Sequence, residues 1–153
     1  MEIIKATIED IETLVKLRVD CMNMILGEMT NEQKASLENQ MRSYVSRALP
    51  EGRFEAFMAK ADGVIASAAF MVINERPASP HFLTGLTATV VNVMTYPEYR
   101  RQGFAASVLA AVIEEAKRRN ITMLDLAATR AGQKLYETVG FEYPDYKLMR
   151  MYL

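Results

Sequence analysis

The spacing of apolar residues predicts two helices in the first third of the chain. Apolar side chains recur every three or four positions over residues 11–25 and again over residues 37–48, as they do on the buried face of a helix. Thr7, with Asp10 three residues later, is typical of a helix N-cap. Arg18 is an exception, because it falls on the apolar stripe of the first helix and interrupts it.

The middle of the chain changes to a strand-like pattern. Short apolar runs rich in β-branched and small residues cover 54–60, 64–73 and 87–95, and a brief strand is expected at 3–4. Asp62-Gly63 separates the first two long runs, and this dipeptide favours a tight hairpin turn. We therefore expect at least three neighbouring strands after the two helices.

The last third alternates between the two patterns. Residues 104–119 have a helical apolar face, residues 121–128 are typical of a buried strand, and residues 132–139 form a short helix closed by Gly140. Two short strands are expected within 141–153. The predicted order of elements, βααβββαβαββ, is that of a mixed α/β (α+β) domain built on one sheet.

Composition adds limits on size and surroundings. The 153 residues are the length of one domain, so we expect residues 1–153 to fold as a single unit, and half of them are apolar. The formal charge of -1 gives no electrostatic reason to expect nucleic acid or an anionic membrane as a partner. Charged residues follow Met1 at once, without the apolar core of a signal peptide, so we expect a soluble, cytoplasmic protein.

The rarest residues restrict the chemistry. With Cys21 as the single cysteine, an intrachain disulfide is excluded and a reducing compartment is expected. With His81 as the single histidine, His-rich metal sites are excluded, and no metal is expected. Cys21 lies in a helical run typical of a core thiol, and His81 follows a Pro-rich stretch and is expected on the surface of a loop. An enzyme of this composition must obtain its chemistry from other groups.

One turn has the features of an anion site. Tyr96-Pro97 ends the strand over 87–95, and a basic turn then leads into a helix that starts near Gly103. A helix N-terminus offers unpaired N–H donors, and Arg100 and Arg101 can add charge-assisted hydrogen bonds to a phosphate. A match to R-x-x-G-x-A alone is weak evidence, since about 0.1 to 0.2 such matches arise by chance in a chain of this length. The absence of GxxxxGK[ST] and GxGxxG argues against a nucleotide triphosphatase or a dinucleotide oxidoreductase.

Two motifs together resemble the GNAT superfamily, the GCN5-related N-acetyltransferases. Arg100-x-x-Gly103-x-Ala105 resembles the family's Q/R-x-x-G-x-G/A signature for acetyl-CoA, and Leu135-Tyr136-Glu137 followed by Gly140-Phe141 resembles its second block, LYE-x-x-GF. The order of elements also matches. The resemblance implies a central, mostly antiparallel sheet that is splayed between the fourth and fifth strands and flanked by helices.

The resemblance also implies where a cofactor lies. Acetyl-CoA would be the co-substrate, with its pantetheine arm along the backbone of Val93 and Thr95 and with Met94 between them. Val93 and Met94 are equally typical of a plain core strand. Both roles can hold together, because a cofactor bound to the backbone leaves the side chains free to pack. The pyrophosphate would lie on the basic turn, next to Arg100 and on the backbone of the residues Arg101, Gln102, Gly103, Phe104, Ala105 and Ala106.

The implied reaction is direct transfer of the acetyl group of acetyl-CoA to an amine of a small molecule or a peptide. Tyr136 matches the family tyrosine that assists the departing thiolate. A non-catalytic acyl-CoA-binding or sensing module is the alternative, because residues 87–93 lack the carboxylate that many relatives carry there. The proton acceptor is therefore open between a bound water, which we favour, and Glu28 or Asp125. A homodimer is a further expectation from the family.

Overall fold

The computed structural model describes all 153 residues, and its elements follow the predicted order through the last helix. Single turns of 3-10 helix at Ile8–Asp10 and Pro97–Tyr99 precede α1 and α3. The strands and helices are β1 (Glu2–Lys5), α1 (Ile11–Leu26), α2 (Asn31–Ala48), β2 (Phe54–Ala61), β3 (Val64–Glu75), β4 (Leu86–Thr95), α3 (Phe104–Arg118), β5 (Met123–Asp125) and α4 (Gln133–Val139).

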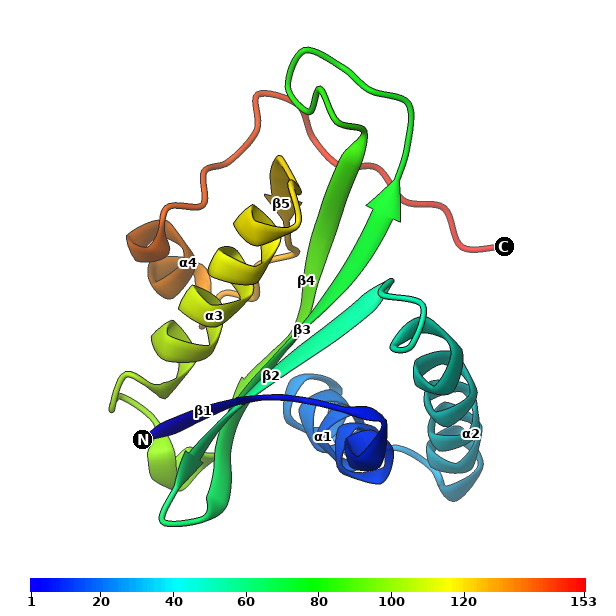
Figure 1. The fold of residues 1–153 in the computed structure, drawn as a ribbon. Coiled ribbons are helices and arrows are strands. Elements are labelled where there is room, and N and C mark those ends of the chain that lie inside the picture. Colours follow the sequence, from blue (N-terminus) through cyan, green and yellow to red (C-terminus); the bar gives the residue numbers. More distant parts are fainter.

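The five strands form one sheet in the order β1-β2-β3-β4-β5 (Figure 1). Neighbours are antiparallel except β4 and β5, which run parallel. The β4–β5 pairing is short, because only Thr87–Thr89 pair with Met123–Asp125. Residues 90–95 of β4 have no strand on that side. This confirms the predicted mostly antiparallel sheet that is splayed between its fourth and fifth strands.

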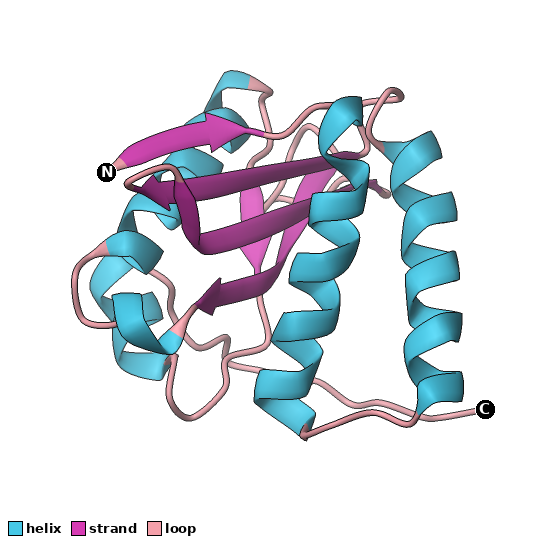
Figure 2. Cartoon of the chain, turned by 90° about the horizontal axis from the view of Figure 1, so that it is seen from below, coloured by secondary structure: helices cyan, strands magenta, loops and turns pink.

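Helices cover both faces of the sheet and form two separate cores. α1 and α2 lie side by side on one face, where Leu14, Val45 and Phe70 are fully buried (Figure 2). α3 and α4 cover the other face around Val108 and Leu109. The sheet therefore separates two layers, and these layers can meet only where the sheet is open.

A buried carboxylate joins the end of α3 to the first two strands. Glu55 on β2 is almost completely buried and accepts hydrogen bonds or ion pairs from Arg119 Nη1 at 2.8 Å and Lys5 Nζ at 3.1 Å. Lys5 Nζ also forms an ion pair with Glu115 Oε1 on α3, at 2.9 Å, and Arg118 pairs with the Glu115 carboxylate as well. Removing one charge from such a network leaves its partner unpaired in a low-dielectric environment, so the network fixes how α3 lies on the sheet.

Several helices and turns begin or end where local signals in the sequence predict it. Thr7 and Asp10 form the predicted capping box, in which the Thr7 N–H donates to Asp10 Oδ2 at 2.8 Å. The Asp62-Gly63 hairpin turn has positive φ at both residues, as a two-residue turn of this kind requires. Gly140 ends α4 with φ +115°, a left-handed conformation that glycine adopts without steric cost.

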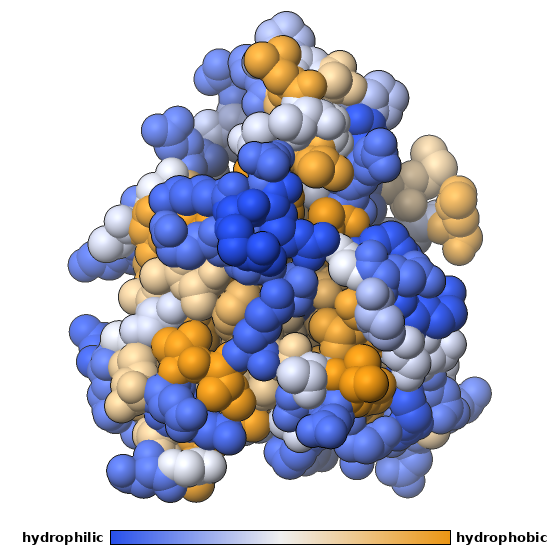
Figure 3. Space-filling model, in the orientation of Figure 1, coloured by the Kyte–Doolittle hydropathy of each residue, from blue (hydrophilic) through white to orange (hydrophobic).

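Two predictions about strands were wrong. The strand expected at 121–128 is limited to Met123–Asp125, because β4 turns away after Thr89 and leaves later residues without a partner. No strand forms in 141–153, where the two short strands were expected. That segment crosses from α4 toward the side of α1 and α2, and its apolar side chains are exposed at the chain end (Figure 3). No helix is long and apolar enough to cross a membrane.

Candidate active site

A β-bulge in β4 lies at the point where the sheet opens. Ala68 pairs with Met94 and Phe70 pairs with Val91, so two residues of β4 face a single residue of β3. Asn92 is the bulged residue, with φ +56°, which asparagine tolerates better than most side chains. Bulges bend a strand and increase its twist, and this bulge accounts for the departure of β4 from β5.

The helix α1 holds this bulge in place through the Asn92 side chain. Asn92 is buried, and its Nδ2 donates to the backbone oxygen of Leu17 at 3.3 Å. Its Oδ1 accepts a hydrogen bond from Arg18 Nη1 at 3.4 Å. Arg18, the residue that interrupts the apolar stripe of α1, therefore points at the bulge of β4.

The free edge of β4 presents backbone groups to the opening. The Tyr96 N–H donates to Ala66 on β3 at 3.0 Å, so alternation along the strand turns the backbone groups of Val93 and Thr95 toward the splay. Met94 points its side chain into the core below α1, and its carbonyl accepts a short hydrogen bond of 2.6 Å from Ser67 Oγ. Val93 is half-buried against the other core.

The turn after β4 leaves a row of donors unpaired. None of the backbone N–H groups from Arg101 to Ala106 bonds to another group of the protein, and the first internal bond of the helix comes from Ser107 to the Gly103 carbonyl at 3.0 Å. Arg101 and Gly103 both have positive φ, which turns successive N–H groups to one side. A Cβ on Gly103 would meet no heavy atom within 4 Å, so the backbone of the turn is uncovered on that side of Gly103.

The side chains of the turn are mostly exposed and fix its shape. Arg100 Nε donates to the Thr95 carbonyl at 3.2 Å, and Gln102 Nε2 donates to the Glu98 carbonyl at 3.0 Å. Phe104 is buried and anchors the start of α3. The remaining residues of the predicted phosphate site that face solvent, fully or in part, are Arg101, Gly103, Ala105 and Ala106.

Tyr136 is buried on α4 and fits closely against its own helix. A Cβ on Gly132 would lie 2.6 Å from Cε2 of Tyr136, and Phe141 packs edge-on at 6.1 Å between ring centroids. The hydroxyl bonds to no group of the protein, yet it is not sealed from outside space. Burial raises the pKa of the phenol, and the nearby Cys21 adds to the rise. Tyr136 is therefore a neutral donor whose hydroxyl has no internal partner.

Cys21 lies on α1 with the first core and is fully buried, as expected of a core thiol. It also contributes to the raised pKa of Tyr136 on α4. Burial raises the pKa of the Cys21 thiol, and Arg18 opposes the rise. A neutral, buried thiol is a poor nucleophile. His81 is exposed in its loop, as predicted.

The carboxylates that could act as a proton acceptor lie in different parts of the structure. Glu28 is exposed in the loop between α1 and α2, and Asp125 is exposed on β5 opposite Thr89. Asp20, which the sequence did not single out, accepts hydrogen bonds from Tyr96 Oη and Lys16 Nζ, both at 2.5 Å. These two contacts neutralise Asp20 and tie α1 to the end of β4. No group of three His, Cys, Asp or Glu side chains could hold a metal ion.

Sequence reasoning also missed Arg18 and Asn92 as members of the site. Each left a signal, because Arg18 breaks an apolar helical stripe and Asn92 interrupts a run of Val and Thr. A polar residue in such a position needs a buried partner, and here the two are partners of each other. Their contact across 74 positions of sequence could not be read from either local pattern.

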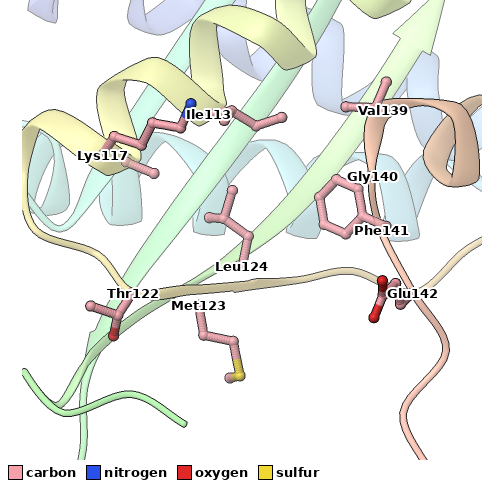
Figure 4. A pocket seen from close by; sticks show the side chains of 10 residues that line it. Ile113, Lys117, Thr122, Met123, Leu124, Val139, Gly140, Phe141 and Glu142 are labelled. Carbon is pink, nitrogen blue, oxygen red and sulfur yellow. The ribbon is translucent and has the colours of Figure 1, made fainter.

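A hollow of about 420 Å³ lies elsewhere, on the open side of β5 (Figure 4). Ile113 and Lys117 of α3 line one side of it, Leu124 of β5 the floor, and Phe141 the end. These α3 residues are about ten positions, or roughly 15 Å, from the unpaired donors at the start of the helix. The hollow is therefore separate from the site at the bulge.

The fold and the site together define a class of protein. A sheet that opens beside a strand with free backbone groups, next to a row of unpaired helix N-terminal donors, suits an extended cofactor that carries phosphates. Residues 18–141 match the model of the acetyltransferase (GNAT) family, so the chain belongs to that family.

Known structures and proteins agree with this assignment. A predicted acetyltransferase from Clostridium acetobutylicum, whose crystal structure contains acetyl-CoA, has a TM-score of 0.85 and 25% identity, covering 98% of this chain and 95% of its own. A GCN5-related N-acetyltransferase from Ralstonia eutropha has the same fold, with a TM-score of 0.84 and 19% identity over 98% and 97% of the two chains.

A curated relative gives a more limited match. The ribosomal protein bS18-alanine N-acetyltransferase of Escherichia coli is 37% identical over 57 residues, which is 35% of this chain. The match spans only 38% of the length of that relative. It therefore supports membership of the family. The acceptor named for the relative, an alanine of ribosomal protein bS18, is a property of that protein.

Proposed function

We propose that this protein is an acetyl-CoA-dependent N-acetyltransferase that passes the acetyl group directly to an amine of a small molecule or a peptide. The observation that carries the proposal is the row of unpaired N–H groups from Arg101 to Ala106, in the turn and first helical residues that follow β4. These donors and the positive end of α3 suit a pyrophosphate. Family membership adds the chemistry of acyl transfer.

The cofactor arm has a matching edge on β4. The backbone groups of Val93 and Thr95 face the opening, as an extended pantetheine with amide groups requires. The Thr95 carbonyl is held by Arg100, which leaves the Thr95 N–H and the groups of Val93 for the arm. Arg101 would add charge beside the phosphates. Acetyl-CoA, when bound, supplies an activated thioester, so the protein needs no nucleophile of its own.

Tyr136 would assist the leaving thiolate. Proton transfer from a phenol with a pKa near 10 to a thiolate whose thiol has a pKa near 8.5 is uphill by about 2 kcal/mol. Because burial raises the pKa of Tyr136, proton transfer is still less favourable. A hydrogen bond to the developing charge on sulfur is therefore the role we assign to its hydroxyl.

The acceptor amine must be neutral when it attacks. A lysine-like amine with a pKa of about 10.4 is neutral to only about four parts in ten thousand at pH 7, which costs about 4 to 5 kcal/mol. Glu28 and Asp125 are exposed, and Asp20 is already paired. A bound water that passes the proton to solvent is the proton acceptor that fits this set of residues.

A non-catalytic acyl-CoA-binding module is the alternative, favoured by the lack of a carboxylate on β4. Calorimetric titration with acetyl-CoA and thiol release with a panel of amines separate the two. The panel includes small diamines, free amino acids and a peptide that begins with alanine, the residue modified by the bS18-alanine relative. Binding together with amine-dependent thiol release supports the enzyme. Binding without release from any amine supports the module.

A further inference from the structure

Arg18 differs from every other arginine of the chain. Arg42, Arg53, Arg118 and Arg119 are paired with carboxylates, and the other arginines without a carboxylate partner are exposed. Arg18 alone is half-buried and lacks a carboxylate partner. Its only hydrogen bond to a side chain is the long one, of 3.4 Å, to Asn92 Oδ1. A guanidinium has five N–H donors in a planar fork, so most of its donors here are unused.

The unused donors face space that a ligand can reach. The only buried side-chain nitrogen or oxygen without a partner is Asn23 Oδ1, so the free nitrogens of Arg18 are not sealed within the protein. Arg18 reaches Asn92 at the bulge of β4, where the sheet opens, so it lies on the α1 side of the opening. Its effect on the pKa of Cys21, and that of Cys21 on the pKa of Tyr136, agree with this placement.

The phosphates of the cofactor do not account for this arginine. Its contact on β4, Asn92, is three residues before Thr95, or about 10 Å along the strand, and the row of phosphate donors begins still later, at Arg101. The nearby carboxylate on the same helix, Asp20, is already paired with Lys16 and Tyr96. The missing negative partner is therefore neither a side chain of the protein nor the pyrophosphate.

We propose that Arg18 binds a carboxylate of the acceptor, so that the acceptor is an amine with a carboxylate on the same molecule, such as an amino acid. This inference rests on the proposed function and adds the class of acceptor to it. The planar fork of a guanidinium matches the two oxygens of a carboxylate, and the pair is strong in a partly desolvated site. Asn92 orients the guanidinium from the β4 side, which leaves the opposite edge for the ligand.

The test compares each of the twenty free amino acids with its own amide in acetyl-CoA-dependent thiol release. The amide removes the negative charge and keeps the amine and side chain. We expect the best free amino acid to exceed its amide in kcat/KM by about tenfold to a hundredfold, the range of a hydrogen-bonded charge pair. Arg18→Gln should bring this ratio close to one. Arg18→Lys, which keeps the charge, should retain part of the preference.

Arg47→Gln is the matched control, because Arg47 is exposed on α2 and has no carboxylate partner. It should leave the acid-to-amide ratio unchanged. Thermal unfolding and acetyl-CoA binding show whether each variant is folded, and the wild-type ratio needs no variant at all. Thiol release without preference for the acid overturns the inference and leaves the proposed function standing. Thiol release from no amine contradicts the proposed function, and the inference falls with it.

Discussion

Gly132 and Tyr136 are so close that a Cβ on Gly132 would lie 2.6 Å from Cε2 of the tyrosine ring. Gly132 has φ -90° and ψ -17°, so alanine fits its backbone without strain, and its Cβ crowds the ring most, ahead of Thr129 Oγ1 at 3.3 Å. We predict that Gly132→Ala displaces the Tyr136 hydroxyl and lowers kcat by about tenfold, the scale of a misplaced catalytic hydrogen bond. The dissociation constant of acetyl-CoA should change less than about twofold. Steady-state kinetics and calorimetry measure both quantities.

A double variant shows whether Gly132 acts through the hydroxyl. If it does, adding Gly132→Ala to Tyr136→Phe should lower kcat little further, because the group that it displaces is already gone. If the two substitutions instead lower kcat by independent factors that multiply in the double variant, this explanation is contradicted. The alanine would then disturb the protein by another route than the Tyr136 hydroxyl.

Gly103 tests the phosphate turn. Gly103→Leu should weaken acetyl-CoA binding by about tenfold or more, because a side chain in the open space would cover the unpaired N–H groups. Gly63→Leu is a matched control, since Gly63 also has a positive φ, of +80°, and open space around it, but lies in the β2–β3 hairpin. Both variants pay about 1 to 2 kcal/mol for the left-handed backbone. Equal acetyl-CoA affinity in the two would contradict the assigned turn.

Glu115 links the stability of the fold to pH. The Arg118 guanidinium, and after it Lys5, lower the pKa of Glu115 to about 2, from an ordinary value of 4.5. A lowered folded-state pKa contributes stability above the unfolded value, and this is lost as the pH falls from 4.5 toward 2. Both partners are partly exposed, so we expect a contribution of about 1 to 2 kcal/mol.

Urea unfolding at pH 6 and pH 3 measures this contribution. Glu115→Gln should lower the free energy of unfolding at pH 6 and reduce its dependence on pH. Glu114→Gln is the control, because Glu114 is exposed and pairs only with exposed Lys117. A Glu115→Gln protein that loses as much stability on acidification as the wild type would contradict the account.

Most of the fold could be predicted from the sequence because its signals are local. The capping box at Thr7, the hairpin at Asp62-Gly63 and the helical stripe after Gly103 each depend on neighbours in sequence. The strands near the chain end could not be predicted in this way. A strand needs a partner, and because β4 bends at Asn92 the residues after Asp125 have none on that side. Residues 141–153 form no strand either, and their local pattern does not show whether a partner is within reach.

The site was predicted less completely than the fold. The basic turn and Tyr136 lie in local motifs, so the sequence indicates them, and their roles stay predictions. The contact between Arg18 and Asn92 joins a helix to a strand. Each residue alone is a polar exception in the local pattern of its element, which does not show that the two are partners. The Asp20–Tyr96 hydrogen bond, which ties α1 to the end of β4, is non-local for the same reason.

The most direct test of the central claim is the rate of acetyl-CoA-dependent thiol release by wild type, Tyr136→Phe and Tyr143→Phe with the best amine of the panel. Tyr143 is exposed and its hydroxyl bonds to Glu137, so this variant removes a phenol outside the opening. We predict that Tyr136→Phe lowers kcat by about tenfold or more with little change in acetyl-CoA affinity, and that Tyr143→Phe leaves kcat unchanged. An unchanged kcat in Tyr136→Phe would contradict the proposed active site.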